Sequence, residues 1–344
     1  MITHSRPTIT DEDRLAVDRQ LSSGNIAKGT LVNDFQNVFE QYTSVQKCRF
    51  VDSGSKAIFM ALQILKIGNG DEVILPTYLC HNVLDAVIES GAVPVLCDIS
   101  DGWNADVNDV EKVFTGRTKC IILVHTMGIA VDVNNFKKFN VPIIEDCCQA
   151  LGSKNSKGEM VGGIGDFSVF SFHAIKCLTT GEGGMLCTNN EKFLDFVNNK
   201  NQIKAIGSSM TDIQAALGIS QLNQYQRFLE RRAKIANDYI DRIELQSLIA
   251  DFKRVSPTTN FYRFLIVSDG AFDDIRSYFS NKGIAVRKGV DELLHLSYPQ
   301  FSRSEYSNAE YILKRTISIP IYPSLTSIQQ NKIVDAINTY EKFR

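Results

Sequence analysis

Short apolar segments alternate with amphipathic segments over the first half of this chain, and this pattern constrains the fold more than any other feature. The apolar segments have the length of strands, and the segments between them have helical spacing of their apolar residues. Expected strands are Lys47–Val51, Glu72–Leu75, Val93–Cys97, Cys120–Val124 and Val141–Glu145, followed by one strand on each side of Lys176. Expected helices are Ser55–Leu65, His81–Ser90, Asp106–Val113 and Val133–Phe139. This alternation predicts an α/β fold with a mostly parallel, seven-stranded sheet and helices on both faces.

The pattern changes after Asn190. A capping box from Thr211 to Gln214 predicts the start of a long helix that reaches about Ile243. Further elements are expected as a strand at 261–267, a helix at 272–282, a short strand at 285–288 and helices at 304–314 and 327–343. The chain is therefore predicted to form a large α/β domain over residues 1–240 and a smaller α+β domain over residues 241–344.

Composition excludes several classes of function. The 344 residues are 44% apolar and carry a formal net charge of −2, without a strongly basic run that would bind nucleic acid. No apolar run approaches the roughly 20 residues that cross a bilayer, and the polar, acidic start does not resemble a signal peptide. The eight cysteines lack metal-site spacing, so no metal site is expected. We expect a cytoplasmic protein without membrane partners, whose cysteines are reduced and serve as small core residues.

Two groups of polar residues follow expected strands. The turn from Val51 to Ser55 leads into a helix, and its Gly54 and Ser55 are suited to bind a phosphate through free N–H groups and a hydroxyl. The same turn is also consistent with an ordinary helix start capped by serine. Asp146 and Gln149 follow a buried strand at the edge where open α/β sheets place ligands. Asp146 is suited to bind a cation or a protonated ring nitrogen, and Gln149 is suited to donate to a ring oxygen. The alternative is that Asp146 only caps the turn that follows the strand.

The third group is the stretch from Gly165 to Thr188, which reads as a strand, a loop with Lys176, a glycine-rich turn and a second strand. Lys176 either extends to solvent or lies in a pocket where its pKa falls and its amine becomes a nucleophile. Ser171 offers a second hydroxyl for a phosphate. A phosphate turn, an acid for a ring nitrogen and a lysine together match the needs of pyridoxal 5′-phosphate (PLP).

Eight segments of the chain, in order, resemble the DegT/StrS family of nucleotide-sugar aminotransferases, which have the fold-type I architecture of PLP enzymes. SFHAIKCLTTGEGGMLCT is a near match to the family's lysine motif, and IIEDCCQALGS is similar to its acid motif. The remaining segments are SGSKAIFMAL, DEVILPTYLC followed by SGAVPVLCDI, VHTMG, MTDIQAALGISQL and SIPIYPSLT.

The resemblance implies a role for each matching residue. Lys176 would form the internal aldimine and move protons, Asp146 would pair with the pyridinium nitrogen, and Gln149 would contact the ring's phenolic oxygen. Gly54, Ser55 and Ser171 would hold the phosphate, and His173 and His295 are expected near the substrate. The implied reaction moves an amino group from an amino acid, with glutamate as the expected donor, to a keto group of a nucleotide-linked sugar in polysaccharide biosynthesis. A homodimer is implied because the family builds each site from two subunits.

The chain departs from the family at two places. Cys80 stands where the family has an aromatic residue that stacks on the cofactor ring, with Tyr78 and His81 nearby as substitutes. Gly207–Ser209 replace an asparagine and an arginine that serve the partner subunit, and Lys204 is the nearest replacement for the charge. Two alternatives therefore stay open: a non-catalytic binding or regulatory protein on the same fold, and a PLP-dependent sugar dehydratase, although such dehydratases have histidine in place of Lys176.

Overall fold

The computed structural model describes residues 1–198, 210–249, 258–303, 305–340 and 343. Its larger sheet has seven strands in the order β1-β7-β6-β5-β4-β2-β3. They are β1 (Lys47–Val51), β2 (Glu72–Pro76), β3 (Val93–Cys97), β4 (Thr118–Val124), β5 (Ile143–Asp146), β6 (Phe167–Ser171) and β7 (Gly184–Thr188). Neighbouring strands are parallel except that β7 runs antiparallel to both β1 and β6. The predicted mostly parallel sheet is therefore confirmed.

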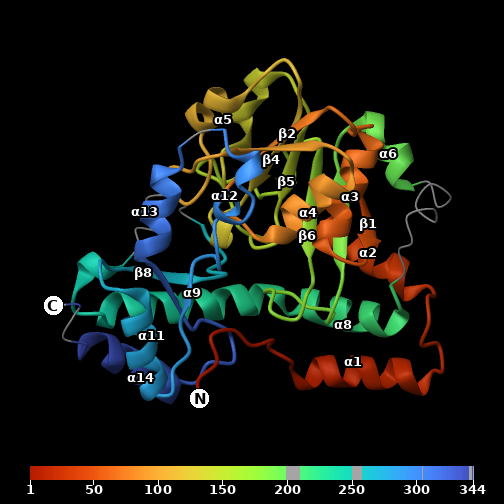
Figure 1. Ribbon diagram of the computed structural model, residues 1–344. Coiled ribbons are helices and arrows are strands. Elements are labelled where there is room, and N and C mark those ends of the chain that lie inside the picture. Colours follow the sequence, from red (N-terminus) through yellow and green to blue (C-terminus); the bar gives the residue numbers. More distant parts are fainter. Residues whose placement is uncertain (199–209, 250–257, 304, 341–342, 344) are drawn as a thin grey trace.

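Helices cover both faces of this sheet (Figure 1). Alternate residues of β6 belong to two different cores: Phe167 and Val169 pack on the side of α3, whereas Phe170 packs on the side of α2. The helical elements of this part are α1 (Asp11–Ser22), α2 (Leu31–Thr43), α3 (Gly54–Ile64), α4 (His81–Glu89), α5 (Val107–Val113), α6 (Glu191–Asn198), α8 (Asp212–Asn223) and α9 (Tyr225–Arg242), with 3-10 turns η1 (Thr126–Gly128) and η2 (Val133–Phe139). The helix expected at 133–139 is thus a 3-10 helix.

A second, three-stranded antiparallel sheet has the order β8-β10-β9. Its elements are β8 (Phe264–Val267), η3 (Gln246–Leu248), α11 (Phe272–Asn281), β9 (Arg287–Lys288), α12 (Leu294–Ser297), η4 (Pro299–Phe301), α13 (Ser307–Arg315), β10 (Thr316–Ile319) and α14 (Ser327–Asn338). The central strand β10 was not predicted. Ile2 bridges to Ile284, so the start of the chain joins this part, and one apolar core extends through both sheets. The division near residue 240 stays a prediction.

The long helix predicted from Thr211 begins as expected but is interrupted. Thr211 and Gln214 form the capping box at the start of α8. The helix stops at Gln224, whose buried side chain donates to Asp13 of α1 at 3.0 Å and to the Ser220 carbonyl at 3.0 Å. These bonds join α1 to the junction of α8 and α9, which run end to end below the sheet in Figure 1.

Glu72 connects the start of β2 to the small-sheet part of the chain. Its buried carboxylate accepts hydrogen bonds from Thr115 at 2.6 Å, Arg117 at 2.7 Å and Arg303 at 2.8 Å. Burial by itself raises the pKa of Glu72, but these three donors outweigh it and lower the pKa to about 2. The carboxylate is therefore charged and held from both parts of the fold.

The cysteines correct one expectation. Cys48 of β1 and Cys187 of β7 lie directly opposite one another and form a disulfide, so this pair is not reduced. Their separation of 139 residues concealed the pairing in the sequence. Cys97, Cys120 and Cys147 are buried free thiols, as expected of core residues. Among the described residues, no helix is both long enough and apolar enough to span a membrane.

Candidate active site

A cavity of about 290 Å³ opens at the carboxyl ends of the central strands. This is the edge at which parallel sheets place their ligands. The structure brings eight of the predicted site residues to its wall: Gly54, Ser55, Cys80, Asp146, Gln149, Ser171, His173 and Lys176. Additional wall residues are Tyr78, Asn82, Thr126, Cys148 and Glu182, of which the sequence had pointed only to Tyr78. Tyr78, Thr126 and Cys148 closely follow the ends of β2, β4 and β5, so the same edge rule could have found them, whereas Asn82 lies in α4 and Glu182 just before β7.

One end of the cavity is suited to an anion. Ser53 caps α3 by accepting a hydrogen bond from the Lys56 N–H at 3.1 Å, and α3 starts at Gly54. A Cβ atom on Gly54 would lie 2.6 Å from Cys148 Sγ and 3.3 Å from Ser171 Cβ. Only glycine therefore lets the start of α3 approach this wall, where a helix N-terminus and the Ser171 hydroxyl favour a phosphate.

Asp146 and Gln149 also line the cavity, and hydrogen bonds from the backbone fix their side chains. Asp146 ends β5, is 5% exposed, and accepts from the Cys148 N–H at 2.9 Å. The side-chain oxygen of Gln149 accepts from the Met127 N–H at 2.7 Å. Its amide N–H groups are therefore left to donate to a ligand, which fits a phenolic oxygen.

Lys176 lies on the loop between β6 and β7 and is partly buried. Its Nζ atom is 5.3 Å from the centroid of the Tyr262 ring. Burial by itself lowers the pKa of Lys176, but Tyr262, Cys148 and the Asp146 carboxylate outweigh it, so the pKa is raised. The expectation that the pKa of Lys176 is lowered is therefore wrong, because the pocket that holds its amine also holds acidic groups.

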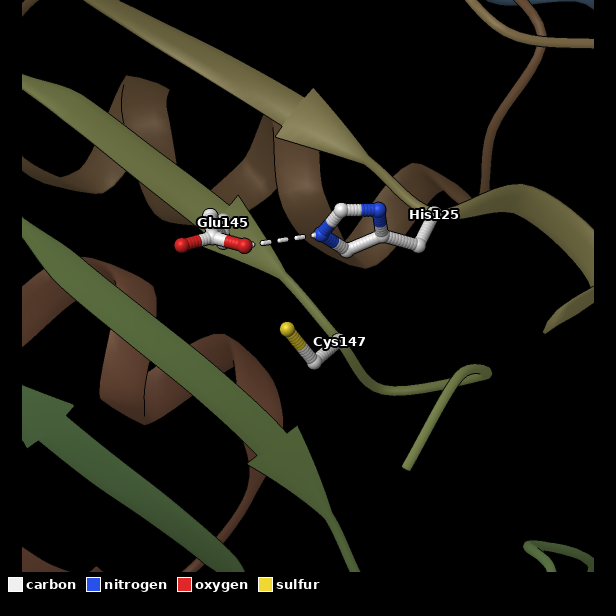
Figure 2. A group of neighbouring side chains, drawn as sticks. All are labelled: His125, Glu145 and Cys147. Atoms are coloured by element: carbon white, nitrogen blue, oxygen red, sulfur yellow. Dashed lines mark hydrogen bonds and ion pairs between the residues drawn. The ribbon is translucent and has the colours of Figure 1, made fainter. Parts of the chain in front are cut away.

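A buried hydrogen-bonded pair of side chains supports the strand that ends in Asp146 (Figure 2). His125 Nε2 lies 3.1 Å from Glu145 Oε2, and both side chains are fully buried. His125 Nδ1 accepts from the Val131 N–H at 2.9 Å, so Nε2 carries the proton that it donates to Glu145. The carboxylate also accepts three backbone N–H groups, those of Gly162, Ile164 and Gly165.

The same cluster offers potential metal ligands, since ligand atoms of His125, Glu145 and Cys147 all lie within 4.8 Å of one another. Both His125 nitrogens and both Glu145 oxygens are already engaged in hydrogen bonds. Burial, followed by the neighbouring carboxylates of Glu145 and Asp146, raises the pKa of Cys147 and keeps it a thiol. His125 and Glu145 therefore form a buried structural hydrogen-bond network with the backbone.

The structure does not bring every candidate residue to the cavity. His295 is buried outside its wall, where Nδ1 lies 2.8 Å from Thr77 Oγ1 and the ring stacks on Tyr306. His81 packs against Tyr298 and does not line the cavity, so Tyr78 is the aromatic substitute that does. Lys204 and Gly207–Ser209 lie outside the described residues.

The wall suits PLP. A narrow, glycine-dependent anion cradle, an acid, a directed amide and a lysine surround one cavity, and these are the groups that a phosphate, a ring nitrogen, a ring oxygen and an aldehyde require. Fold and site together define a PLP-dependent enzyme of the α/β transferase class.

Residues 7–338 match the DegT/DnrJ/EryC1/StrS aminotransferase family, and the chain belongs to this family. It is 33% identical to GDP-perosamine synthase of Escherichia coli O157:H7, over 97% of each chain. It is 28% identical to dTDP-3-amino-3,6-dideoxy-alpha-D-galactopyranose transaminase of Aneurinibacillus thermoaerophilus, over 96% of this chain and 95% of the relative.

Among solved structures, it resembles Spr1654 of Streptococcus pneumoniae, which is named as a sugar aminotransferase. The PMP form has a TM-score of 0.89 at 25% identity over 98% of both chains. The same protein in its PLP form has a TM-score of 0.89 at 26% identity, over 98% of this chain and 97% of that chain. The cofactor of the chain described here is PLP.

Proposed function

We propose that this enzyme transfers an amino group from an amino acid, with glutamate as the donor, to a keto group of a nucleotide-linked sugar. The observation that carries the proposal is the placement of Lys176, Asp146 and Gln149 around the single cavity that also holds the anion cradle. The choice of substrate is supported by relatives whose names specify a GDP-linked and a dTDP-linked sugar. A homodimer and a cytoplasmic setting are part of the proposal.

The predicted cofactor-binding residues on the wall divide the tasks of this reaction. The start of α3 and Ser171 bind the phosphate, Asp146 holds the proton at the ring nitrogen, and Gln149 orients the ring through its oxygen. When bound, PLP supplies an electron sink that stabilises negative charge at the carbon next to the transferred nitrogen. Lys176 Nζ would hold the cofactor covalently in the resting enzyme and, once the amino group of the donor had replaced it there, would take the proton from the α-carbon of the donor.

His173 and Glu182 stand at the cavity wall beside Lys176. His173 Nε2 lies 3.6 Å from Glu182 Oε1, and both side chains are substantially exposed. Together with Asn82 they present hydrogen-bonding groups to a molecule that enters from solvent. We assign these three residues to contact with the sugar hydroxyls.

The test uses the purified full chain loaded with PLP. Adding glutamate is expected to convert the absorbance of the aldehyde form into that of the amine form, and adding a keto nucleotide-sugar is expected to reverse the change. Lys176→Ala should abolish both changes, whereas Lys157→Ala, which alters an exposed lysine, should leave them intact. Absence of a spectral change with every amino acid tried would refute the proposal.

The same experiment separates the two alternatives. A non-catalytic binding protein predicts that no donor produces the amine form. A sugar dehydratase predicts a product that has lost a hydroxyl group without gaining nitrogen, which mass spectrometry detects. Lys176 at the cavity wall favours transamination because that reaction needs an amine both to anchor the cofactor and to move the proton.

A further inference from the structure

Two residues of the cavity wall, Tyr78 and Thr126, have buried hydroxyl groups without a hydrogen-bond partner. Buried polar groups are satisfied in the great majority of cases, so each exception needs an explanation. The Tyr78 hydroxyl is packed against the small-sheet part of the chain, where a Cβ atom on Gly289 would come within 2.0 Å of it. Thr126 has no role in the mechanism described above.

The position of Thr126 is set by hydrogen bonds on both sides of it. The N–H of His125 donates to the Asp146 carbonyl at 3.0 Å, and the N–H of Met127 donates to the Gln149 side chain at 2.7 Å. The N–H of Thr126 itself donates to Asn104 Oδ1 at 2.9 Å. Thr126 is 2% exposed. The backbone at Thr126 is therefore held between the two segments that carry the residues assigned to the cofactor ring.

We propose that Thr126 is a third cofactor-binding residue, whose hydroxyl makes a hydrogen bond to the polar edge of the PLP ring between Asp146 and Gln149. A hydroxyl suits this place because it can donate or accept, depending on which ring atom it meets. The phosphate is excluded as the partner, because the bonds that flank Thr126 lead to Asp146 and Gln149 and not to α3 or Ser171. The inference rests on the proposed cofactor site.

The unpartnered hydroxyl gives this inference a distinctive energetic signature. Without cofactor, a buried hydroxyl that makes no hydrogen bond destabilises the fold, so replacing it with a methyl group is neutral or stabilising. With cofactor, the same replacement removes a hydrogen bond and weakens binding. A residue with a purely structural role would change the stability of both forms in the same direction.

The experiment compares Thr126→Val with Thr126→Ser, titrating the cofactor-free full chain with PLP and measuring melting temperatures with and without it. Thr126→Val is expected to raise the Kd for PLP about tenfold, equivalent to about 1.4 kcal/mol. Its melting temperature should be equal to or above that of the wild type without PLP and below it with PLP. Thr126→Ser retains the hydroxyl and should stay within about threefold of the wild-type Kd.

Thr43→Val is the matched control, because the Thr43 hydroxyl is buried and donates to the Phe39 carbonyl at 2.8 Å in α2. It should lower the melting temperature of both forms and leave the Kd unchanged. Equal Kd values for the wild type and Thr126→Val would overturn the inference while leaving the proposed function intact, whereas a wild type that binds no PLP would overturn both. If Thr126→Val does not fold, Thr126→Ala compared with Thr126→Ser gives the same contrast.

Discussion

Replacing Glu145 with glutamine should destabilise the fold strongly, although the two side chains have nearly the same shape. The carboxylate is fully buried and accepts four hydrogen bonds: from Gly162 at 2.8 Å, Ile164 at 2.8 Å, Gly165 at 2.6 Å and His125 at 3.1 Å. The glutamine NH₂ group must replace one of the two oxygens. In either orientation, two of the four donors then face another donor.

The magnitude follows from these contacts. The histidine cannot adapt by moving its proton to Nδ1, because Nδ1 already accepts from the Val131 N–H. Two buried donors therefore lose their acceptor, at a cost of about 1–3 kcal/mol each. We expect Glu145→Gln to reduce the free energy of unfolding by about 4 kcal/mol, a large part of the 5–15 kcal/mol typical of a domain.

Urea unfolding at pH 7 measures this change. Glu111→Gln is the control, because Glu111 and its partner Lys138 are exposed, and its effect should stay within about 0.5 kcal/mol. Burial alone raises the pKa of Glu145, but the hydrogen bonds from His125 and the backbone outweigh it and hold the pKa below its ordinary value. The stabilisation is therefore present above the unfolded-state pKa and is lost as pH falls through the folded-state pKa. A loss below about 1 kcal/mol at pH 7 would refute the reasoning.

Three further predictions concern the cradle, a second buried acid and the disulfide. Gly54→Ala should weaken PLP binding in an absorbance titration, and adding Cys148→Ala should partly restore it, because the new Cβ would lie 2.6 Å from that sulfur; no restoration would contradict the packing argument. Glu72→Gln should lower the free energy of unfolding by about 2–3 kcal/mol at pH 7, with the difference from wild type vanishing between about pH 4.5 and pH 2 as Glu72 is protonated. Reducing the Cys48–Cys187 bond should lower stability to urea by about 2–4 kcal/mol, whereas a reductant should have no effect on Cys48→Ser.

Much of the large sheet was predictable because its signals are local. The strands Lys47–Val51 and Val93–Cys97 were predicted with their observed bounds. Val93–Cys97 is a continuous apolar run, whereas Lys47–Val51 alternates polar and apolar residues before a turn of small residues. Strand β10 was missed for the opposite reason. The chain passes from α13 directly into Thr316 with extended backbone angles, so no glycine, proline or turn marks the start of the strand.

Several residues that were expected near a ligand line one cavity, whereas His295 does not line it. Asp146 and Lys176 could be assigned to one site because the edge of a parallel sheet collects residues from distant positions. His295 was expected near the substrate because histidine often contacts ligands. Its actual partners, Thr77 and Glu310, come from elements whose proximity only the fold reveals. Thr126 has no distinguishing residue type, and only a complete account of its hydrogen bonds identifies it.

The reversal of direction at β7 has a consequence for how the lysine loop can change. Strands β6 and β7 are antiparallel neighbours, so the loop leaves and returns at the same edge, closed by the pairing of Ser171 with Gly184 and by the bond from the Phe172 N–H to the Gly183 carbonyl at 2.8 Å. A parallel β7 would need a crossover of a dozen or more residues that carried the chain to the far edge before re-entry. A change in the length of the segment from residue 172 to 183 therefore leaves the threading of the sheet unchanged, because both ends of the segment stay at the edge where the cavity lies.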